Sequence, residues 1–290
     1  MHRDTRRAAL TISEFGRRTG LSHKALRLYD LSGLLPPAEV DPANGYRLYA
    51  PEQLDRAKLI SLLRRLDMPL ATVAEVLDGV AEGARDGLER RVLRWWNSQE
   101  DQHRVRRELV EYLRSEWLST DPQRPEYWVA TRSVPETKVA AIRREVDQAA
   151  LVDTMCAAAA EIRGHLTASG TETEQLGFGR EEWWIYHGTV SPDSEAPVEV
   201  CIPFTGPAEP TANITIRVEP AQIQAYATVT KRECLYPRIL HAYDAVTRFV
   251  RDTELSPFGP PREVYFTCLD SVGDDDPFAY VAQPIERIRP

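Results

Sequence analysis

The second half of the sequence repeats itself once, and this duplication limits the possible folds more than any single motif does. Three pairs of segments parallel each other in the same order: "VPETKVAAI" (134–142) with "VEPAQIQAY" (218–226), "REEWWIY" (180–186) with "REVYFTC" (262–268), and "VCIPF" (200–204) with "VAQPI" (281–285). The offsets are 84, 82 and 81 residues. Each copy has the pattern of strand, strand, helix, strand, strand. We therefore expect a duplicated α+β domain over residues 125–290, with a groove at the pseudo-two-fold axis.

The duplication also indicates which side chains line this groove. The 82-residue offset equates Trp184 with Phe266, and strand alternation then predicts two matching faces, formed by residues 182, 184 and 186 and by residues 264, 266 and 268. Aromatic faces with one or two carboxylates suit flat, hydrophobic and cationic ligands. The predicted ligand-binding residues are Glu182, Trp184, Tyr186, Glu199, Tyr226, Phe266, Phe278 and Tyr280. Plain core packing of the aromatic residues is the alternative.

The N-terminal part carries the pattern of two short helices joined by a tight turn. Thr11 and Glu14 have the spacing of a capping box, which predicts a helix over 12–19. Gly20 is suited to end it, and Ser22 to cap the next helix. The core side should hold Ile12, Phe15, Leu26 and Leu31. Two such helices form a helix-turn-helix candidate, whose second helix meets DNA with its first turns.

A basic, aromatic hairpin is predicted next. Asn44-Gly45 is a turn signal between extended residues and precedes "YRLY" (46–49). Residues 1–66 hold 12 Lys and Arg against 7 Asp and Glu, although the whole chain has a net charge of -8. A locally basic segment on an acidic chain indicates that this segment is the one that meets a polyanion. We expect the hairpin to be a wing that lies along phosphates.

Residues 84–120 have the pattern of one long helix of about thirty residues. This stretch has no Pro, and no Gly after Gly87. Apolar residues follow a three-four spacing in an imperfect heptad pattern: Leu88, Val92, Trp95, Leu109 and Leu113. A partner helix that covers this seam is expected, and packing on the chain's own body is the alternative. A polar linker, 119–125, separates this helix from the duplicated domain.

Two resemblances join these parts. "ISEFGRRTGLSHKALRLYDLSGLLPP", "GYRLY" and "RRLDMPLATVAEVL" resemble the DNA-binding head of the MerR family, and "GPPREVYF" with "YPRILHAYDAVTRFV" resembles the GyrI-like effector domain of BmrR-type multidrug-responsive activators. The resemblance implies a multidomain α and α+β protein, made of a winged helix-turn-helix head (9–80), a coiled-coil dimerisation helix (84–120) and a GyrI-like domain (125–290). The predicted DNA-binding residues are Arg17, Arg18, Ser22, His23, Lys24, Arg27, Tyr29, Tyr46, Arg47, Tyr49 and Arg64.

The function that the resemblance implies is a dimeric, ligand-responsive transcriptional regulator, most simply an activator. It would bind a palindromic operator, remodel promoter DNA for RNA polymerase and sense a hydrophobic or aromatic small molecule. In BmrR-type proteins an acidic residue important for cationic drugs follows a "VY" pair, where this chain has Phe266, so a preference for cations would require Glu182 or Glu199 to take that role from another strand. The alternative is a GyrI-like hydrolase or a drug-sequestering protein. We expect no catalytic set, metal site, cofactor or membrane segment, and a cytoplasmic location.

Overall fold

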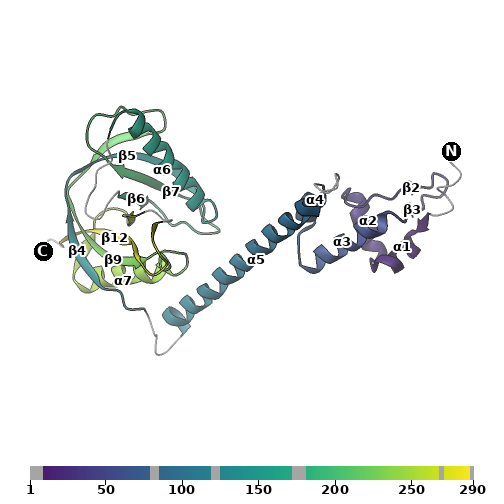
Figure 1. Ribbon diagram of the computed structural model, residues 1–290. Coiled ribbons are helices and arrows are strands. Elements are labelled where there is room, and N and C mark those ends of the chain that lie inside the picture. The colour runs from purple at the N-terminus through teal and green to yellow at the C-terminus, as the bar shows by residue number, and fades with distance from the viewer. Residues whose placement is uncertain (1–8, 79–84, 119–124, 172–180, 268–270, 288–290) are drawn as a thin grey trace. The chain divides into compact units, whose positions relative to one another are not determined.

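A computed structural model describes residues 9–78, 85–118, 125–171, 181–267 and 271–287 (Figure 1). The chain divides into two compact units, residues 1–101 and 102–290, which are described separately below. The predicted linker 119–125 lies outside the described residues except for its last position. No helix among the described residues is long and apolar enough to cross a lipid bilayer.

The first unit begins with a small winged helical head. Its elements are β1 (Leu10–Thr11), α1 (Ile12–Thr19), α2 (His23–Leu31), β2 (Glu39–Val40), β3 (Arg47–Tyr49), α3 (Gln53–Arg65) and α4 (Leu70–Asp78). The strands form a three-stranded sheet in the order β1-β3-β2. The predicted helix-turn-helix and the hairpin that follows it are thus both present.

Local capping explains where the first two helices begin. The Thr11 hydroxyl accepts from the Glu14 backbone amide at 3.3 Å and the Glu14 carboxylate accepts from the Thr11 amide at 2.9 Å, which confirms the capping box. Gly20 ends α1 with φ 72°, a left-handed conformation that glycine adopts without strain. Ser22 accepts from the Ala25 amide at 3.1 Å and caps α2.

The core of the head is built around an aromatic stack. Phe15 and Tyr49 are fully buried, with ring centroids 4.4 Å apart, and Leu26 is buried beside them. The prediction that Leu31 belongs to this core was wrong, since Leu31 is 82% exposed. It is the last residue of α2, whose buried residues are Leu26 and Tyr29.

The long helix predicted over 84–120 is α5 (Arg85–Leu113), which continues as one turn of π-helix, η2 (Arg114–Leu118). Its first half belongs to the first unit and packs Leu88, Val92 and Trp95 against the head core. These residues were predicted to face a partner helix, so the first half of that seam packs on the chain's own head. Leu113, the last residue of the predicted seam, is exposed, as are four apolar residues outside the seam: Leu93, Trp96, Val110 and Trp117.

After the end of α5 and η2, the described residues of the second unit form a nine-stranded sheet and two helices. Its strands are β4 (Val129–Val134), β5 (Thr137–Val146), β6 (Glu182–Tyr186), β7 (Ala196–Pro203), β8 (Thr215–Glu219), β9 (Gln222–Thr230), β10 (Leu255–Pro257), β11 (Arg262–Tyr265) and β12 (Pro277–Arg287). The helices are α6 (Leu151–Ala168) and α7 (Ile239–Asp252). The strand order is β4-β9-β12-β11-β6-β7-β5-β8, and β10 pairs with β12.

This strand order confirms the duplication. The first copy is β4, β5, α6, β6, β7, and the second is β8, β9, α7, β11, β12, with β10 added. Exchanging corresponding strands of the two copies reverses the order and otherwise leaves it unchanged, which places the pseudo-two-fold axis between β6 and β11. The first strand of each copy pairs with the second strand of the other copy: β4 pairs with β9, and β8 pairs with β5.

Both helices lie on one face of the sheet (Figure 1). The α6 cluster includes Ile142 and Trp184, and the α7 cluster includes Val229 and Val281. A third cluster occupies the opposite face, with members from the strands and from Phe266, the residue after β11. The two matching faces that the 82-residue offset predicted are therefore wrong. In the β6–β11 register Trp184 pairs with Glu263, so Val264 and Phe266 point to the opposite face. Cys268 lies outside the described residues.

Candidate functional site

The exposed side of α2 is the first candidate site. Ser22, His23, Lys24 and Arg27 are all exposed at the start of the helix, as predicted for a helix that enters the major groove. Arg17 and Arg18 are exposed in the last turn of α1, where their positive charges also interact favourably with the negative end of the helix dipole. The two helices together present a positively charged edge that suits the DNA backbone.

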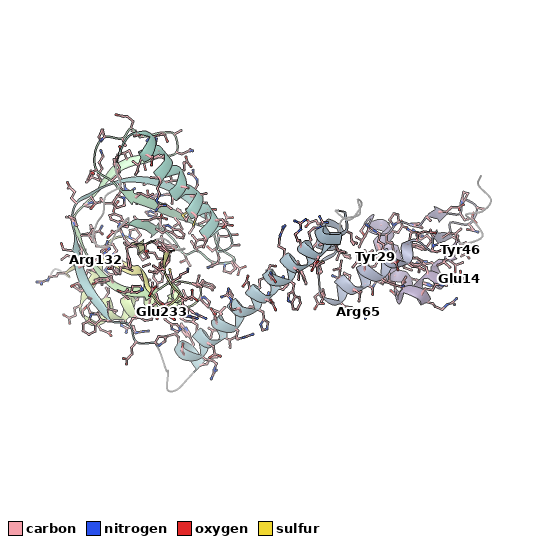
Figure 2. The ribbon with its side chains drawn as sticks, in the orientation of Figure 1. Glu14, Tyr29, Tyr46, Arg65, Arg132 and Glu233 are labelled. Atoms are coloured by element: carbon pink, nitrogen blue, oxygen red, sulfur yellow. The ribbon has the colours of Figure 1, made fainter. Side chains whose placement is uncertain are left out.

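The wing is attached to this helix by an ion pair. The Arg47 guanidinium on β3 lies 2.6 Å from the Asp30 carboxylate on α2. The wing tip is ordered by its own backbone, since the Asp41 amide donates to the Tyr46 carbonyl at 2.9 Å and Gly45 has φ 71°. Tyr46 is 65% exposed at this tip (Figure 2). The pair with Asp30 holds the wing beside the recognition helix and leaves Tyr46 free to contact a ligand.

Two of the predicted DNA contacts are instead core residues. Tyr29 is buried on the inner side of α2, and Tyr49 stacks on Phe15. Because Leu10 of β1 pairs with Tyr49, the tyrosine ring is directed under the sheet towards α1. Burial raises the pKa of Tyr49. Arg64 remains exposed as predicted, although its guanidinium also donates to the Met68 carbonyl.

The second candidate site is a cavity of about 360 Å³ in the sheet's helical face, beside the pseudo-two-fold axis. Trp184 and Tyr186 of β6 and Glu263 and Tyr265 of β11 line it. The other lining residues are Gln148, Leu151, Val152, Gly188, Thr189, Val190, Cys234, Leu235, Tyr236, Ile239, Leu240, Tyr243 and Pro261. Among the described residues that line the cavity, Glu263 alone is acidic or basic. A groove between the two copies was predicted, and the cavity lies there.

Three tyrosine hydroxyls surround the Glu263 carboxylate. Tyr243 donates to Oε1 at 2.9 Å, Tyr265 donates to Oε2, and Tyr186 also bonds to the carboxylate. Glu263 is 5% exposed. Burial raises its pKa, and the tyrosine hydrogen bonds oppose this rise only in part. The same burial and the neighbouring carboxylate raise the pKa of all three tyrosines, so they remain protonated donors.

Aromatic rings form the walls around this carboxylate. Trp184 and Tyr265 lie 4.9 Å apart between ring centroids, and Tyr186 meets Tyr243 edge to face at 6.4 Å. Ring faces and a buried carboxylate both attract a cation, while the apolar lining rewards burial of hydrocarbon. The arrangement is therefore chemically suited to an aromatic or lipophilic cation.

Two predicted ligand residues line the cavity, and a third supports it. Trp184 and Tyr186 are lining residues as predicted. Glu182 does not line the cavity. Its carboxylate accepts from the Trp184 indole N–H at 2.6 Å and lies 2.6 Å from the Arg163 guanidinium. Glu182 thus fixes the orientation of the Trp184 ring.

Glu199 lies on the opposite face of the sheet, in an ion-pair network. It is bound by Arg217 at 2.8 Å, His187 at 3.0 Å and Arg143 at 3.3 Å. Burial works to raise its pKa, but these partners outweigh it, so the pKa of Glu199 lies below its usual range. A carboxylate satisfied by three partners has little capacity left for a ligand.

The remaining predicted ligand residues pack elsewhere. Tyr226 and Tyr280 lie on the non-helical face, with the Arg132 guanidinium 5.6 and 4.7 Å from their ring centroids, and Phe266 contacts Tyr280 at 4.7 Å. A register shift in β12 accompanies Phe278, which packs behind Tyr265 at 5.4 Å. None of these residues is among those lining the cavity.

The sequence reasoning missed Glu263, Tyr265 and Tyr243. The signal was present in the third pair of segments, whose offset is 81. In the β6–β11 register Glu263 pairs with Trp184 and Tyr265 pairs with Glu182, so these four side chains lie on the same face of the sheet. Corresponding residues of the two copies therefore share a face when the offset is odd. Applied to β11, the offset of 81 matches Glu182 with Glu263 and Trp184 with Tyr265.

Comparison with known families decides the nature of the head. The model of the MerR HTH family regulatory proteins matches residues 10–80. Residues 10–80 are a MerR-type DNA-binding domain. The match covers the capped helices, the wing and the two helices that follow, so the MerR-type head includes the whole first candidate site.

Two curated regulators share this region. The transcriptional regulator BrlR of Pseudomonas aeruginosa is 43% identical over 101 residues, which are 34% of this chain and 35% of BrlR. The multidrug-efflux transporter 1 regulator of Bacillus subtilis is 38% identical over 68 residues, 23% of this chain and 24% of the relative. The chain therefore spans about a third or less of the length of these relatives.

Among solved structures, the EcmrR–DNA complex matches 96% of this chain and 100% of its own, with a TM-score of 0.46 and 22% identity.

Within the described ranges, no three His, Cys, Asp or Glu side chains gather in a way that could hold a metal ion.

Proposed function

We propose that this chain is a ligand-responsive, sequence-specific transcriptional regulator, in which residues 9–80 bind DNA, 84–120 dimerise and 125–290 bind an effector. The observation that carries the proposal is the presence, on one chain, of a MerR-type head and a cavity lined by the buried Glu263 carboxylate. A ligand-responsive regulator needs both parts: the head would bind a specific DNA site, and the cavity would bind the effector.

The DNA-binding residues in this proposal are half-buried Arg47 and the predicted residues that are exposed: Arg17, Arg18, Ser22, His23, Lys24, Arg27, Tyr46 and Arg64. Tyr29 and Tyr49 shape the surface from below. Two copies joined through α5 would present two recognition helices to a palindromic operator. The exposed apolar residues Leu93, Trp96 and Val110 of α5 and Trp117 of η2 supply a surface that a second copy would cover.

The proposed effector is an aromatic or lipophilic cation, held by Glu263 and the rings of Trp184, Tyr186, Tyr243 and Tyr265. A cation over a ring contributes about 0.5–2 kcal/mol, depending on how far both are desolvated. Effector binding would favour one of two protein states and so remodel promoter DNA for RNA polymerase. Deformation of a site of this length costs on the order of 1–6 kcal/mol.

Chemical conversion of the ligand is the competing function. A buried carboxylate among tyrosine hydroxyls is a general-base candidate, since burial raises its pKa and so makes it a stronger base than an exposed carboxylate. Incubating the protein with an excess of an aromatic epoxide, which carries an electrophilic carbon, and identifying the recovered compound by mass spectrometry separates the two functions. A regulator returns the compound intact, and a hydrolase returns a product.

The experiment that tests the proposal has two arms. In the first, the full chain selects duplexes from a random DNA pool at low salt, and a regulator is expected to enrich a palindrome. In the second, tryptophan quenching compares N-benzylquinolinium with its neutral isostere, 1-benzylnaphthalene. Enrichment of no sequence, or equal affinity for both compounds, would contradict the corresponding half of the proposal.

A further inference from the structure

Helix α7 has two different faces, both within the second unit. One side contributes Ile239, Leu240 and Tyr243 to the cavity, and Tyr243 bonds directly to Glu263. Another side presents polar residues at spacings of three and four: Arg238 at the N-cap, His241, Asp244 and Arg248. This spacing places the four polar residues along one stripe of the helix.

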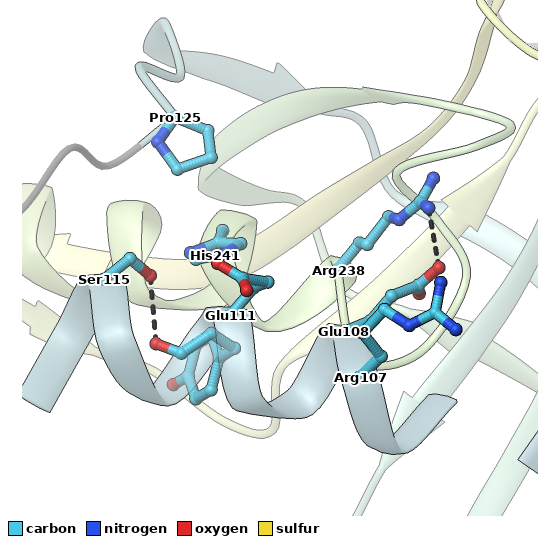
Figure 3. Close-up of a pocket in the computed structure, with 8 residues that line it drawn as sticks. Arg107, Glu108, Glu111, Ser115, Pro125, Arg238 and His241 are labelled. Atoms are coloured by element: carbon cyan, nitrogen blue, oxygen red, sulfur yellow. Dashed lines mark hydrogen bonds and ion pairs between the residues drawn. The ribbon is translucent and has the colours of Figure 1, made fainter. Parts of the chain in front are cut away.

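The polar stripe of α7 contacts the C-terminal end of the long helix. The contacts are Arg238–Glu108 at 2.6 Å, Tyr112 Oη to Asp244 Oδ2 at 2.7 Å, Arg248–Glu116 at 3.5 Å and His241–Glu116 at 3.5 Å. Figure 3 shows the Arg238–Glu108 contact, and these two residues line a pocket of about 360 Å³ together with Glu111 and His241. The Tyr112 and His241 rings also meet at 5.0 Å.

These contacts are better shielded than ordinary surface ion pairs. The Glu108 and Glu116 side chains are 14% and 8% exposed. Salt and water weaken exposed pairs to a small contribution, whereas partly buried pairs keep more of their strength and depend more sharply on geometry. A small shift of α7 therefore changes the energy of its contact with α5 and η2.

The cavity side gives a reason for such a shift. A cation that reaches the Glu263 carboxylate competes with the tyrosine hydroxyls for the same oxygens, and Tyr243 belongs to α7 itself. The helix is anchored along its length by buried Ala242, Val246 and Val250, so it is expected to respond as one body. In the first unit the same α5 packs Leu88, Val92 and Trp95 against the core of the head.

We infer that α7 is the element through which an occupied cavity acts on the head, with the polar contacts to Glu108, Tyr112 and Glu116 as the coupling. This inference rests on the proposed function and names its regulatory step. A ligand drives the step only through a difference in affinity between two states. The coupling residues touch no ligand, so their removal separates binding from response.

The test uses the full chain and a promoter that carries the selected operator. Arg238→Gln combined with Asp244→Asn is expected to leave the affinity for N-benzylquinolinium within about twofold, measured by tryptophan quenching. The ligand-dependent change in transcription is expected to fall about fivefold or more, which is within the range of measured coupling between sites. A second double variant, Glu108→Arg with Arg238→Glu, exchanges the charges of one pair. It is expected to respond to the ligand more strongly than Arg238→Gln with Asp244→Asn, because the pair can still form.

Arg232→Gln is the matched control, because Arg232 pairs with Asp275 at 3.0 Å on the exposed surface of the same unit. A native response in the double variant, with the same ligand affinity, would overturn the inference and leave the proposed function intact. Absence of any ligand response in the unmodified chain would overturn both. Circular dichroism melts identify a variant that fails to fold. If Arg238→Gln with Asp244→Asn fails to fold, the response of the charge-exchange variant tests the inference in its place.

Discussion

Replacing Glu263 by Gln removes the one acidic or basic group among the described residues that line the cavity, while keeping nearly the same shape. A cation about 4 Å from a carboxylate, at an effective dielectric constant of about 20, is attracted by about 4 kcal/mol. Loss of water from the ligand and rearrangement of the tyrosine hydrogen bonds offset part of this. We therefore expect N-benzylquinolinium to bind Glu263→Gln ten- to a hundredfold more weakly, or by about 1.4–2.7 kcal/mol.

The same substitution is expected to stabilise the fold. Burial raises the pKa of Glu263, so the folded protein holds this proton more tightly than the unfolded chain does. The stability linked to this group is highest below the ordinary glutamate pKa and declines as pH rises through the raised value. Because glutamine does not ionise, the melting temperature of Glu263→Gln should exceed that of the native protein by more at pH 8 than at pH 4.

Calorimetric titration and thermal melts measure both effects, with exposed Glu195→Gln as the control that changes neither. Affinity for neutral 1-benzylnaphthalene should stay within about twofold, because only the charge has been removed. An unchanged affinity of Glu263→Gln for the cation, or a variant less stable than the native protein at pH 8, would refute the role assigned to this carboxylate.

Three further substitutions test other parts of the account. Arg47→Ala should weaken binding to all DNA sequences alike and reduce the slope of log K against log salt by about 1, and an unchanged slope would remove Arg47 from the phosphate contacts. Tyr49→Phe should stabilise the head by about 1 kcal/mol in a denaturant melt, because the buried hydroxyl has no partner among the described residues. Its DNA affinity should stay native, and a tenfold loss would show a direct contact. Glu182→Ala should weaken ligand binding several-fold by freeing the Trp184 indole, with a shift in tryptophan emission, while Glu182→Gln retains an acceptor and most of the affinity.

The head could be predicted closely because its signals are local. A capping box, a glycine with positive φ and a hairpin turn each depend on residues within one turn of each other. The fates of Tyr29, Tyr49 and Leu31 could not be predicted in this way. Their burial depends on which side of a short element the rest of the head covers, and a three-residue strand gives too little alternation to decide it.

The body illustrates a different limit. Its duplication and the location of its cavity followed from the order of segments, which tolerates an error of one residue in alignment. The lining residues did not, because side chains on a strand alternate and a one-residue error inverts the face. Trp184 was therefore matched with Phe266 in place of Tyr265, and Glu263 was passed over although it stands in the quoted "REVYF" segment.

The seam of α5 shows a third limit. The spacing of Leu88, Val92 and Trp95 predicted an apolar stripe correctly, but a stripe does not say what covers it. Leu88, Val92 and Trp95 pack against the chain's own head, whereas Leu113 of the same stripe is exposed.

Run-off transcription tests the central claim most directly, since it requires the head and the cavity to act together. The template carries the operator selected by the protein, and native chain and Glu263→Gln are compared with and without N-benzylquinolinium. The account predicts that the cation changes transcript yield with the native chain and has little effect with the variant at the same concentration. Equal yields from native protein with and without the cation, at concentrations where tryptophan quenching is complete, would contradict it.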